Sequence, residues 1–318
     1  MKQITHLVFG GNALRTLCLC GILRYLYFYD MDKNIRDVAG TSMGAFFALA
    51  FALKIPIDKL EKYIYKVCNN PKLTKINCSS FLNIIDTYGF GSSLDYLDVI
   101  KEYIKEIYDQ DDLTFLELSK KTGVNLYVST TRVNDGKNII FNVNDTPNIS
   151  VIEAVAASMC VPIISKPIII DGYNYIDGYL TNNFPIDYFD HINKDNILGV
   201  AVNLEKDYNK VIIKQNEEIP FTTYIYSIMY MFYNNTYKLC YYNKFSNYPN
   251  FLIIKNSPIR SIFEPIINEN ENCIDFSISE DDINNLFLQG FKEINDYMNL
   301  YNKEKEEDYS NNNRDLAL

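Results

Sequence analysis

Two strand–turn–helix units near the start of the chain constrain the fold more than any other feature of the sequence. Residues 4–9 are mostly apolar and predict a short buried strand, which Gly10-Gly11 interrupts before a helix expected over about residues 14–29. Residues 35–39 predict a second strand, and the apolar run 45–53 predicts a buried helix soon after it. Successive units of this kind build a parallel sheet with helices packed on it. The sequence therefore predicts an α/β fold with three α/β/α layers around a central, mostly parallel sheet.

The remainder of the chain continues this alternation and gives no sign of an internal repeat. We expect a single domain over residues 1–301, with helical additions over 200–301 and a frayed, charged and Asn-rich tail over 302–318. Turn signals separate the later elements. The expected helices are 57–67, 97–108, 114–121 and 150–158, and the expected strands are 125–131, 138–142, 167–170, 174–176 and 196–203.

Two stretches allow a second interpretation. Residues 221–248 are rich in tyrosine and other aromatics, which is typical of a helix packed on the domain but also of a surface that faces lipid. Residues 72–93 are loop-rich and contain Gly89 and Gly91, so we expect this region to cover the site.

Composition and charge exclude several classes of protein. The 318 residues carry 30 Lys and Arg against 40 Asp and Glu, a formal net charge of −10, which argues against a nucleic-acid partner. The sequence has no apolar run of ~20 residues for a transmembrane helix and no signal-peptide pattern at its start. Seven cysteines without a pairing pattern predict reduced thiols in a cytoplasmic protein. Cys18 and Cys20 are better explained as small buried side chains than as zinc ligands.

The segment Gly40-Thr41-Ser42-Met43-Gly44 has the pattern G-x-S-x-G between a predicted strand and a predicted helix. A sharp strand-to-helix turn needs small residues on both sides of a nucleophile, and the turn exposes the serine hydroxyl. The start of the helix also presents free N–H groups at the same place. We therefore expect Ser42 to be a nucleophile, with Gly40 and Gly44 forming its turn. The alternative is a helix cap made by Ser42 or Thr41.

A second loop follows the first strand and contains Gly10, Gly11, Asn12 and Arg15. Its small residues allow backbone N–H groups to approach a ligand closely, as in an oxyanion hole. The same loop could bind a phosphate or a dinucleotide, but it lacks the G-x-G-x-x-G spacing and the lysine of a P-loop. Arg15 alone could equally be a surface cation.

Asp177-Gly178 ends an apolar strand and precedes Asn182-Asn183 and Pro185. An Asp-Gly pair most simply forms a turn. Asp171-Gly172, a few residues earlier, is the same dipeptide, and we expect it only to form a turn. Asp177 differs from it in the residues that follow.

Four motifs in order make the chain similar to the patatin-like phospholipases, which are acyl hydrolases of the cytosolic-phospholipase type with a Ser–Asp dyad. The similarity covers about residues 5–190 and includes a Gly-rich loop, a nucleophile elbow, an Ala-Ser-x-x-x-Pro helix end and an Asp-Gly turn followed by Asn and Pro. These motifs correspond here to residues 7–16, 40–44, 154–162 and 177–185.

The resemblance implies a patatin-like fold and a metal-free, cofactor-free lipid acyl hydrolase. In that mechanism Ser42 attacks an ester carbonyl and Asp177 takes its proton, while Gly178 supports the turn that carries Asp177. An unassisted carboxylate is a weak base, so partial burial and the helix dipole must aid it. The residues implied for the oxyanion hole are Gly10, Gly11, Asn12 and Arg15.

The chain departs from the family pattern at three places. The Gly-Gly-Gly of the family is Gly11-Asn12-Ala13 here, and the Gly after the arginine is Thr16. Alanine adopts left-handed backbone conformations poorly, so we expect the third amide of the loop to be shifted or unused. Tyr179 replaces the usual second glycine after Asp177 and is expected to narrow the site.

Three alternatives stay open at this stage. One is a Ser42–Asp177–His191 triad, which has the chain order of the α/β-hydrolases. Another is an inert lipid-binding or interaction protein of the same fold. The third is transfer of the acyl group to an acceptor other than water.

The expected partner is a phospholipid or another acyl lipid, reached by peripheral contact with membranes. The acidic net charge provides no general attraction to anionic lipid, so docking is expected to depend on apolar residues or a local patch. The sequence does not indicate an oligomeric state.

Overall fold

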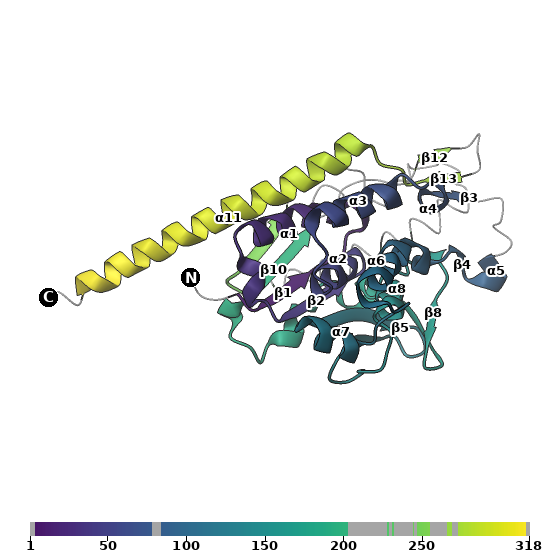
Figure 1. The fold of residues 1–318 in the computed structure, drawn as a ribbon, viewed down its shortest axis with the longest axis horizontal. Helices are drawn as coiled ribbons and strands as arrows, with labels where there is room; N and C mark the ends of the chain where they lie inside the picture. The colour runs from purple at the N-terminus through teal and green to yellow at the C-terminus, as the bar shows by residue number, and fades with distance from the viewer. Residues whose placement is uncertain are drawn as a thin grey trace.

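A mostly parallel sheet forms the centre of the computed structural model, which describes residues 4–77, 84–202, 228, 231, 244, 247–254, 266–268 and 273–315. Within these residues, eight strands make up the sheet (Figure 1). They are β1 (His6–Phe9), β2 (Asp37–Thr41), β5 (Asn125–Arg132), β6 (Lys137–Asn142), β8 (Ile168–Ile170), β9 (Tyr173–Asp177), β10 (Ile197–Val202) and β11 (Phe251–Ile254).

The strand order is β11-β10-β1-β2-β5-β9-β8, and β6 pairs with β5. The first five strands in this order are parallel, whereas β6, β8 and β9 join antiparallel. Every residue of β10 is buried, as expected for a parallel strand covered on both faces. Two hairpins join the antiparallel strands, β5 to β6 across Asn134-Asp135-Gly136 and β8 to β9 across Asp171-Gly172. Asp171 and Gly172 both have positive φ, as a type I′ turn requires.

Helices cover both faces of the sheet, which confirms the expected α/β/α layers. Alternate strand residues divide between two cores: Leu7 and Phe9 face the larger core, and Val8 faces the smaller one. The larger core contains side chains of α1 (Leu19–Phe28), α2 (Met43–Ala52), α3 (Ile57–Cys68), α6 (Asp98–Tyr108), α7 (Phe115–Thr122), α8 (Val151–Ser158) and α11 (Glu280–Asp315). The smaller core contains side chains of α9 (Tyr179–Asn182) and the 3₁₀ helix η5 (Pro185–Phe189).

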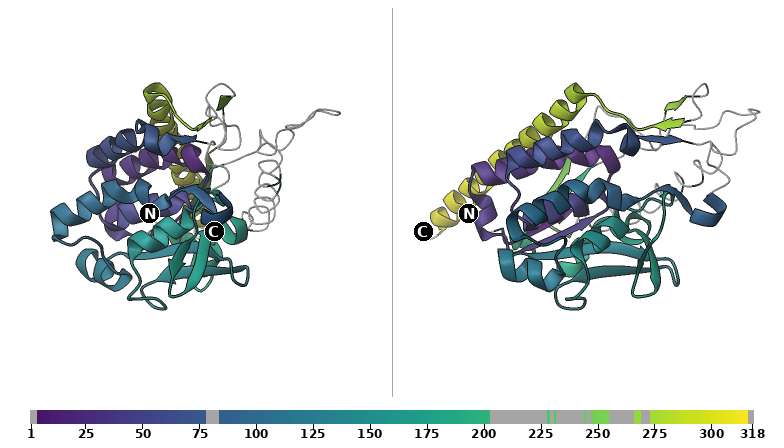
Figure 2. Two further views of the ribbon diagram at one scale, coloured as in Figure 1. Left: turned by 90° about the vertical axis from the view of Figure 1, so that its right-hand side faces the viewer. Right: turned by 45° about the vertical axis from the view of Figure 1, so that its right-hand side comes forward.

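The long helix α11 crosses α1 at very short distance (Figures 1 and 2). A Cβ atom on Gly21 of α1 would lie 1.9 Å from the carbonyl oxygen of Phe287, and one on Gly290 of α11 would lie 1.8 Å from that of Cys18. The two backbones therefore touch, because glycine at both positions leaves no side chain between them. The contact attaches the C-terminal helix to the segment that directly follows the Gly-rich loop.

The structure differs from the expectations beyond residue 200. Described residues there form strands as well as a helix, since β11 extends the sheet and β12 (Ile266–Asn268) and β13 (Cys273–Asp275) pair antiparallel with each other. Residues 302–315, expected to fray, continue α11, because this stretch has no glycine or proline and is rich in Lys and Glu, which favour helix. Most of the aromatic stretch 221–248 lies outside the described residues.

The region 72–93, expected to cover the site, contains several short elements, and its residues 78–83 lie outside the described part. β3 (Lys75–Asn77) pairs with β13, and β4 (Gly89–Gly91) pairs with β7 (Ile163–Ser165). The remaining elements are α4 (Pro71–Thr74), α5 (Ile84–Thr87), and the 3₁₀ helices η1 (Ala13–Cys18), η2 (Met31–Asn34), η4 (Ser93–Leu97) and η6 (Lys194–Asn196).

Candidate active site

Two strands that meet end to end bring Ser42 and Asp177 together. β2 runs parallel to β5 as far as Thr41, which pairs with Ser129. β9 runs antiparallel to β5 along the same edge and ends at Asp177, which pairs with Thr130, the next residue of β5. The residue after β2 and the last residue of β9 therefore meet beside one point of β5.

The turn at Ser42 has the backbone geometry that the G-x-S-x-G pattern predicts. Ser42 has φ 55° and ψ −131°, a strained conformation for a residue with a side chain, and α2 begins at the next residue. A Cβ atom on Gly40 would lie 2.4 Å from the carbonyl oxygen of Gly44, and one on Gly44 would lie 2.6 Å from that of Phe9. The turn can close only because both positions are glycine.

Ser42 and Asp177 are joined by a direct hydrogen bond. The Ser42 hydroxyl donates to Asp177 Oδ2 over 2.7 Å, across 135 positions of sequence. Asp177 is 1% exposed and Ser42 is 7% exposed. Burial raises the pKa of Asp177 to about 7, although the hydrogen bonds from the Tyr179 amide and the Ser42 hydroxyl act in the opposite direction. A carboxylate with this pKa is a much stronger base than an ordinary aspartate near neutral pH.

The turn after Asp177 orients the carboxylate. The Tyr179 amide donates to Asp177 Oδ1 over 2.8 Å, and the Thr131 hydroxyl donates to the Asp177 carbonyl oxygen over 2.9 Å. A Cβ atom on Gly178 would lie 2.2 Å from the carbonyl oxygen of Ser129, so the turn needs glycine to pack on β5. Tyr179, expected to narrow the site, instead places its side chain in the smaller core on the opposite face of the sheet.

Ser158 supports the turn at Ser42, a role that the sequence did not reveal. The Ser42 amide donates to Ser158 Oγ over 2.7 Å, and the Ser158 hydroxyl donates to the Ser129 carbonyl oxygen over 2.6 Å. Ser158 is the last residue of α8 and belongs to the Ala-Ser-x-x-x-Pro motif. That motif is the sequence signal that could have identified this role. Its serine, at the end of α8, stabilises the strained backbone of Ser42 through the hydrogen bond.

The amides of the Gly-rich loop are arranged differently from the expectation. The Gly10 amide donates to the Val200 carbonyl oxygen, the Gly11 amide to Asn183 Oδ1 and the Asn12 amide to Thr16 Oγ1, at 2.7–3.0 Å. Each of the three N–H groups expected to bind an oxyanion thus already has an acceptor within the protein. The polar residues Asn183 and Thr16 provide two of these acceptors.

The loop reaches the cavity through its next residues. Ala13 and Leu14 line the cavity beside Ser42 and Met43, and Ala13 adopts φ 45°, the left-handed conformation that alanine disfavours. Among the described residues, neither the Ala13 amide nor the Met43 amide donates to a group outside its own helix. Arg15 is buried and does not belong to the cavity lining in the described part of the chain.

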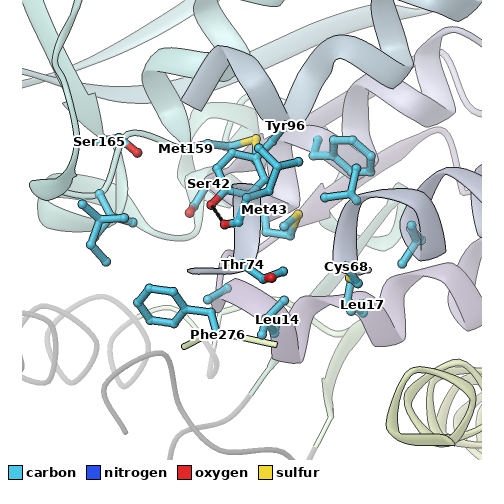
Figure 3. A pocket seen from close by; sticks show the side chains of 17 residues that line it. Leu14, Leu17, Ser42, Met43, Cys68, Thr74, Tyr96, Met159, Ser165 and Phe276 are labelled. Carbon is cyan, nitrogen blue, oxygen red and sulfur yellow. Dashed lines mark hydrogen bonds between the residues drawn. The ribbon is translucent and has the colours of Figure 1, made fainter. Parts of the chain in front are cut away.

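An apolar cavity of about 110 Å³ opens from Ser42 (Figure 3). In the view of Figure 3, Cys68 and Leu17 lie on one side of Ser42 and Ser165 lies on the other. The lining contains no Asp, Glu, Lys, Arg or His among the described residues, and Ser42 provides a hydroxyl at its wall. The lining residues are Ala13, Leu14, Leu17, Ser42, Met43, Phe46, Ile64, Val67, Cys68, Leu73, Thr74, Tyr96, Met159, Val161, Ile164, Ser165 and Phe276.

The structure does not bring His191 to the site. His191 is exposed and interacts electrostatically with His6, which begins β1 and pairs with Asp37 at the start of β2. Ser42 follows the other end of β2. The two histidines therefore lie at the opposite end of the strands from Ser42, so the triad does not form.

The described residues provide no cluster of three or more His, Cys, Asp or Glu side chains that could hold a metal ion. Burial raises the pKa values of the Cys18 and Cys20 thiols, as expected for small buried side chains. In the described part of the chain, no helix combines the length and the apolar character needed to cross a bilayer.

The fold and the site together define an α/β protein with a serine on a strand-to-helix turn beside an apolar cavity. The family model described as patatin-like phospholipase matches residues 7–190, which is more than half of the chain. The chain therefore belongs to the patatin-like phospholipase family.

Two viral proteins and one bacterial structure are similar to the chain. Protein R571 of Acanthamoeba polyphaga mimivirus is 26% identical over 201 residues, which cover 63% of this chain and 66% of that protein. "Probable lipid hydrolase 463L" of Invertebrate iridescent virus 6 is 30% identical over 191 residues, 58% of this chain and 63% of that protein. VipD from Legionella pneumophila has a TM-score of 0.54 at 15% identity, over 92% of this chain and 66% of that one.

Because the sequence identity to VipD is low, the similarity to that structure concerns the fold alone. The chain spans slightly less than two thirds of the length of each of these three relatives.

Proposed function

We propose that the protein is a lipid acyl hydrolase that cleaves a fatty-acyl ester bond of a phospholipid or a related lipid, with Ser42 as nucleophile and Asp177 as general base. The observation that carries the proposal is the 2.7 Å hydrogen bond from Ser42 Oγ to the buried Asp177, at the wall of an apolar cavity. Membership of the patatin-like phospholipase family and the name of the iridescent-virus relative both support a lipid substrate.

The reaction follows from the positions of the two side chains. Ser42 Oγ attacks the ester carbonyl carbon while its proton passes to Asp177 Oδ2. When the tetrahedral intermediate collapses, the carbon–oxygen bond of the ester breaks and the departing alcohol takes that proton from Asp177. Water then attacks the acyl group on Ser42, its proton passes to Asp177, and Ser42 recovers a proton as the fatty acid leaves.

The oxyanion needs N–H donors that face the cavity. Because the amides of Gly10, Gly11 and Asn12 are already bonded, we assign this role to the amides of Ala13 and Met43, whose residues line the cavity together with Ser42. The N-terminus of α2 adds the positive end of its dipole at Met43.

The cavity suits the acyl chain of the substrate. Its lining is apolar and uncharged over the described residues, so burying methylene groups there is favourable by about 0.8 kcal/mol for each. The head group of the lipid then stays outside, where polar groups can remain hydrated.

The test is the release of free fatty acid from a panel of phospholipids and neutral lipids by wild type, Ser42→Ala and Asp177→Asn. We expect release by wild type and a loss of at least about 1,000-fold in both variants. A folded wild-type protein that releases no fatty acid and resists labelling by a fluorophosphonate would favour the inert lipid-binding alternative. Products that carry the acyl group on an added alcohol or lysolipid would instead indicate acyl transfer.

A further inference from the structure

The structure assigns a positioning role to Asn183, a residue of the turn that follows Asp177. We propose that its carboxamide clamps Gly11 against Ser42 and so sets the position of the Gly-rich loop relative to the nucleophile. The proposal rests on the hydrolase function above and adds to it a third residue, one that acts through the backbone rather than on the substrate.

Asn183 pairs with Gly11 as one peptide group pairs with another. The Gly11 amide donates to Asn183 Oδ1 over 3.0 Å, and Asn183 Nδ2 donates to the Gly11 carbonyl oxygen over 2.9 Å. The side chain is completely buried, so both bonds are shielded from water. Only a side chain with a donor and an acceptor side by side, at this length, can make both bonds.

Gly11 connects Asn183 to the nucleophile, because the Gly11 backbone also contacts the turn at Ser42. A Cβ atom on Gly11 would lie 2.6 Å from Ser42 Cβ and 2.6 Å from the Thr41 carbonyl oxygen, so the Gly11 backbone packs directly on the nucleophile turn. The same position lies 3.1 Å from Asn183 Oδ1. Gly11 is therefore in contact with both Asn183 and Ser42, two positions upstream of Ala13 in the cavity wall.

The preceding residue ties the same turn to the nucleophile strand. The hydroxyls of Thr41 and Ser129 both donate to the Asn182 carbonyl oxygen over 3.0 Å. Asn182 and Asn183 thus connect the turn of Asp177 to β2, to β5 and to the Gly-rich loop. The base, the nucleophile and the loop are thus joined by the same turn. A displacement of the loop by about 1 Å would lower the rate of attack by on the order of 100-fold.

The experiment compares Asn183→Asp and Asn183→Leu with wild type. Aspartate keeps an acceptor for the Gly11 amide but cannot donate to the Gly11 carbonyl, and leucine makes neither bond. Buried Asn250, whose Nδ2 donates to the Asp195 carbonyl oxygen far along the sheet, gives the matched controls Asn250→Asp and Asn250→Leu.

We expect kcat to fall by about 10-fold in Asn183→Asp and by about 100-fold in Asn183→Leu, with KM within about threefold of wild type. The Asn250 variants should keep the wild-type kcat. Melting temperatures show which variants are folded, and Asn183→Asp provides the milder change if Asn183→Leu does not fold.

Hydrogen exchange of individual amides gives a readout that does not depend on activity. In Asn183→Leu the Gly11 amide should exchange faster than in wild type, while the Gly10 amide, bonded to Val200, keeps its protection. Unchanged Gly11 protection, or a folded Asn183→Leu with wild-type kcat, would overturn the proposal. If wild type hydrolyses no lipid, the proposed function fails, and the exchange of Gly11 still decides whether the clamp exists.

Discussion

The carboxylate of Asp177 accepts the hydroxyl proton of Ser42 over 2.7 Å while being almost completely withdrawn from water. The same burial that raises the pKa of Asp177 also makes its charge costly to the folded state. Activity and stability should therefore respond to pH in opposite directions.

The first prediction concerns the pH dependence of activity. Asp177 must be ionised to accept the Ser42 proton, and burial raises its pKa to about 7. We expect kcat/KM for ester hydrolysis to rise about tenfold per pH unit below pH 7 and to level off above it. The measurement is the initial rate with a soluble ester between pH 5 and 9, after subtraction of the Ser42→Ala rate. A rate that is constant across this range would contradict an ionising Asp177.

The second prediction concerns stability. An aspartate ionises near pH 3.9 in an unfolded chain, whereas Asp177 in the folded protein ionises near 7. Between these values the folded state binds one more proton than the unfolded state, so the stability contributed by this group falls as pH rises.

The neutral variant Asp177→Asn avoids that loss. At pH 8 its free energy of unfolding should exceed that of wild type by a few kcal/mol, since each unit of pKa shift corresponds to about 1.4 kcal/mol, and near pH 4 the difference should be small. Urea denaturation at the two pH values measures it. Exposed Asp171, in the turn between β8 and β9, gives the control Asp171→Asn, for which little change is expected at either pH.

The third prediction concerns the cavity. Cys68 ends α3 and lines the cavity, where burial raises the pKa of its thiol to about 12. Cys68→Leu fills part of the space and should lower kcat/KM for long acyl chains by about 10-fold while short chains react normally. Cys68→Ala enlarges the space and should not select against long chains. Hydrolysis rates for a series of esters with acyl chains of increasing length measure this effect. Equal losses at every chain length would argue against an acyl site here.

The fourth prediction separates a dyad from a triad. His191 is exposed and lies near His6, at the end of the sheet remote from Ser42. His191→Ala should therefore keep the wild-type kcat within about twofold. A loss comparable with that of Asp177→Asn would restore the triad with His191 as its base.

The fifth prediction concerns the crossing of α1 and α11. Gly290→Ala places a Cβ atom 1.8 Å from the Cys18 carbonyl oxygen, so the helices must separate. We expect the free energy of unfolding to fall by about 1–3 kcal/mol or more. In the control Gly91→Ala, the nearest atom to the new Cβ is 3.8 Å away, and stability should change by less than about 1 kcal/mol. Chemical denaturation measures the free energy of unfolding of both variants. Equal denaturation midpoints for Gly290→Ala and Gly91→Ala would contradict the contact between the backbones of α1 and α11.

Sequence predicted the parts of the site that depend on local chemistry. The turn at Ser42 could be recognised because Gly40 and Gly44 are required by sterics within five consecutive residues. Both Asp177 and Asp171 begin Asp-Gly pairs after apolar strands, so Asp177 could be distinguished only by the Asn and Pro residues that follow it and by the family resemblance that these residues support. The layers and most strands also followed from local patterns of apolar residues.

The partners of the loop amides could not be predicted in the same way. The Gly11 amide bonds to Asn183, 172 positions away, and the Ser42 amide to Ser158, 116 positions away. Both contacts depend on how β2, β9 and α8 assemble around β5, and no local pattern specifies that assembly. The extension of α11 to Asp315 was missed for another reason, because a charged, Asn-rich composition was interpreted as disorder although it contains nothing that breaks a helix.

The crossing of α1 and α11 also has a consequence during synthesis of the protein. Gly21 and Gly290 meet in the folded protein but lie far apart in the sequence. A nascent chain therefore carries α1 with its inner face uncovered while the residues between the two helices are translated. Chaperones that shield apolar surface on growing chains can act at this face during that interval.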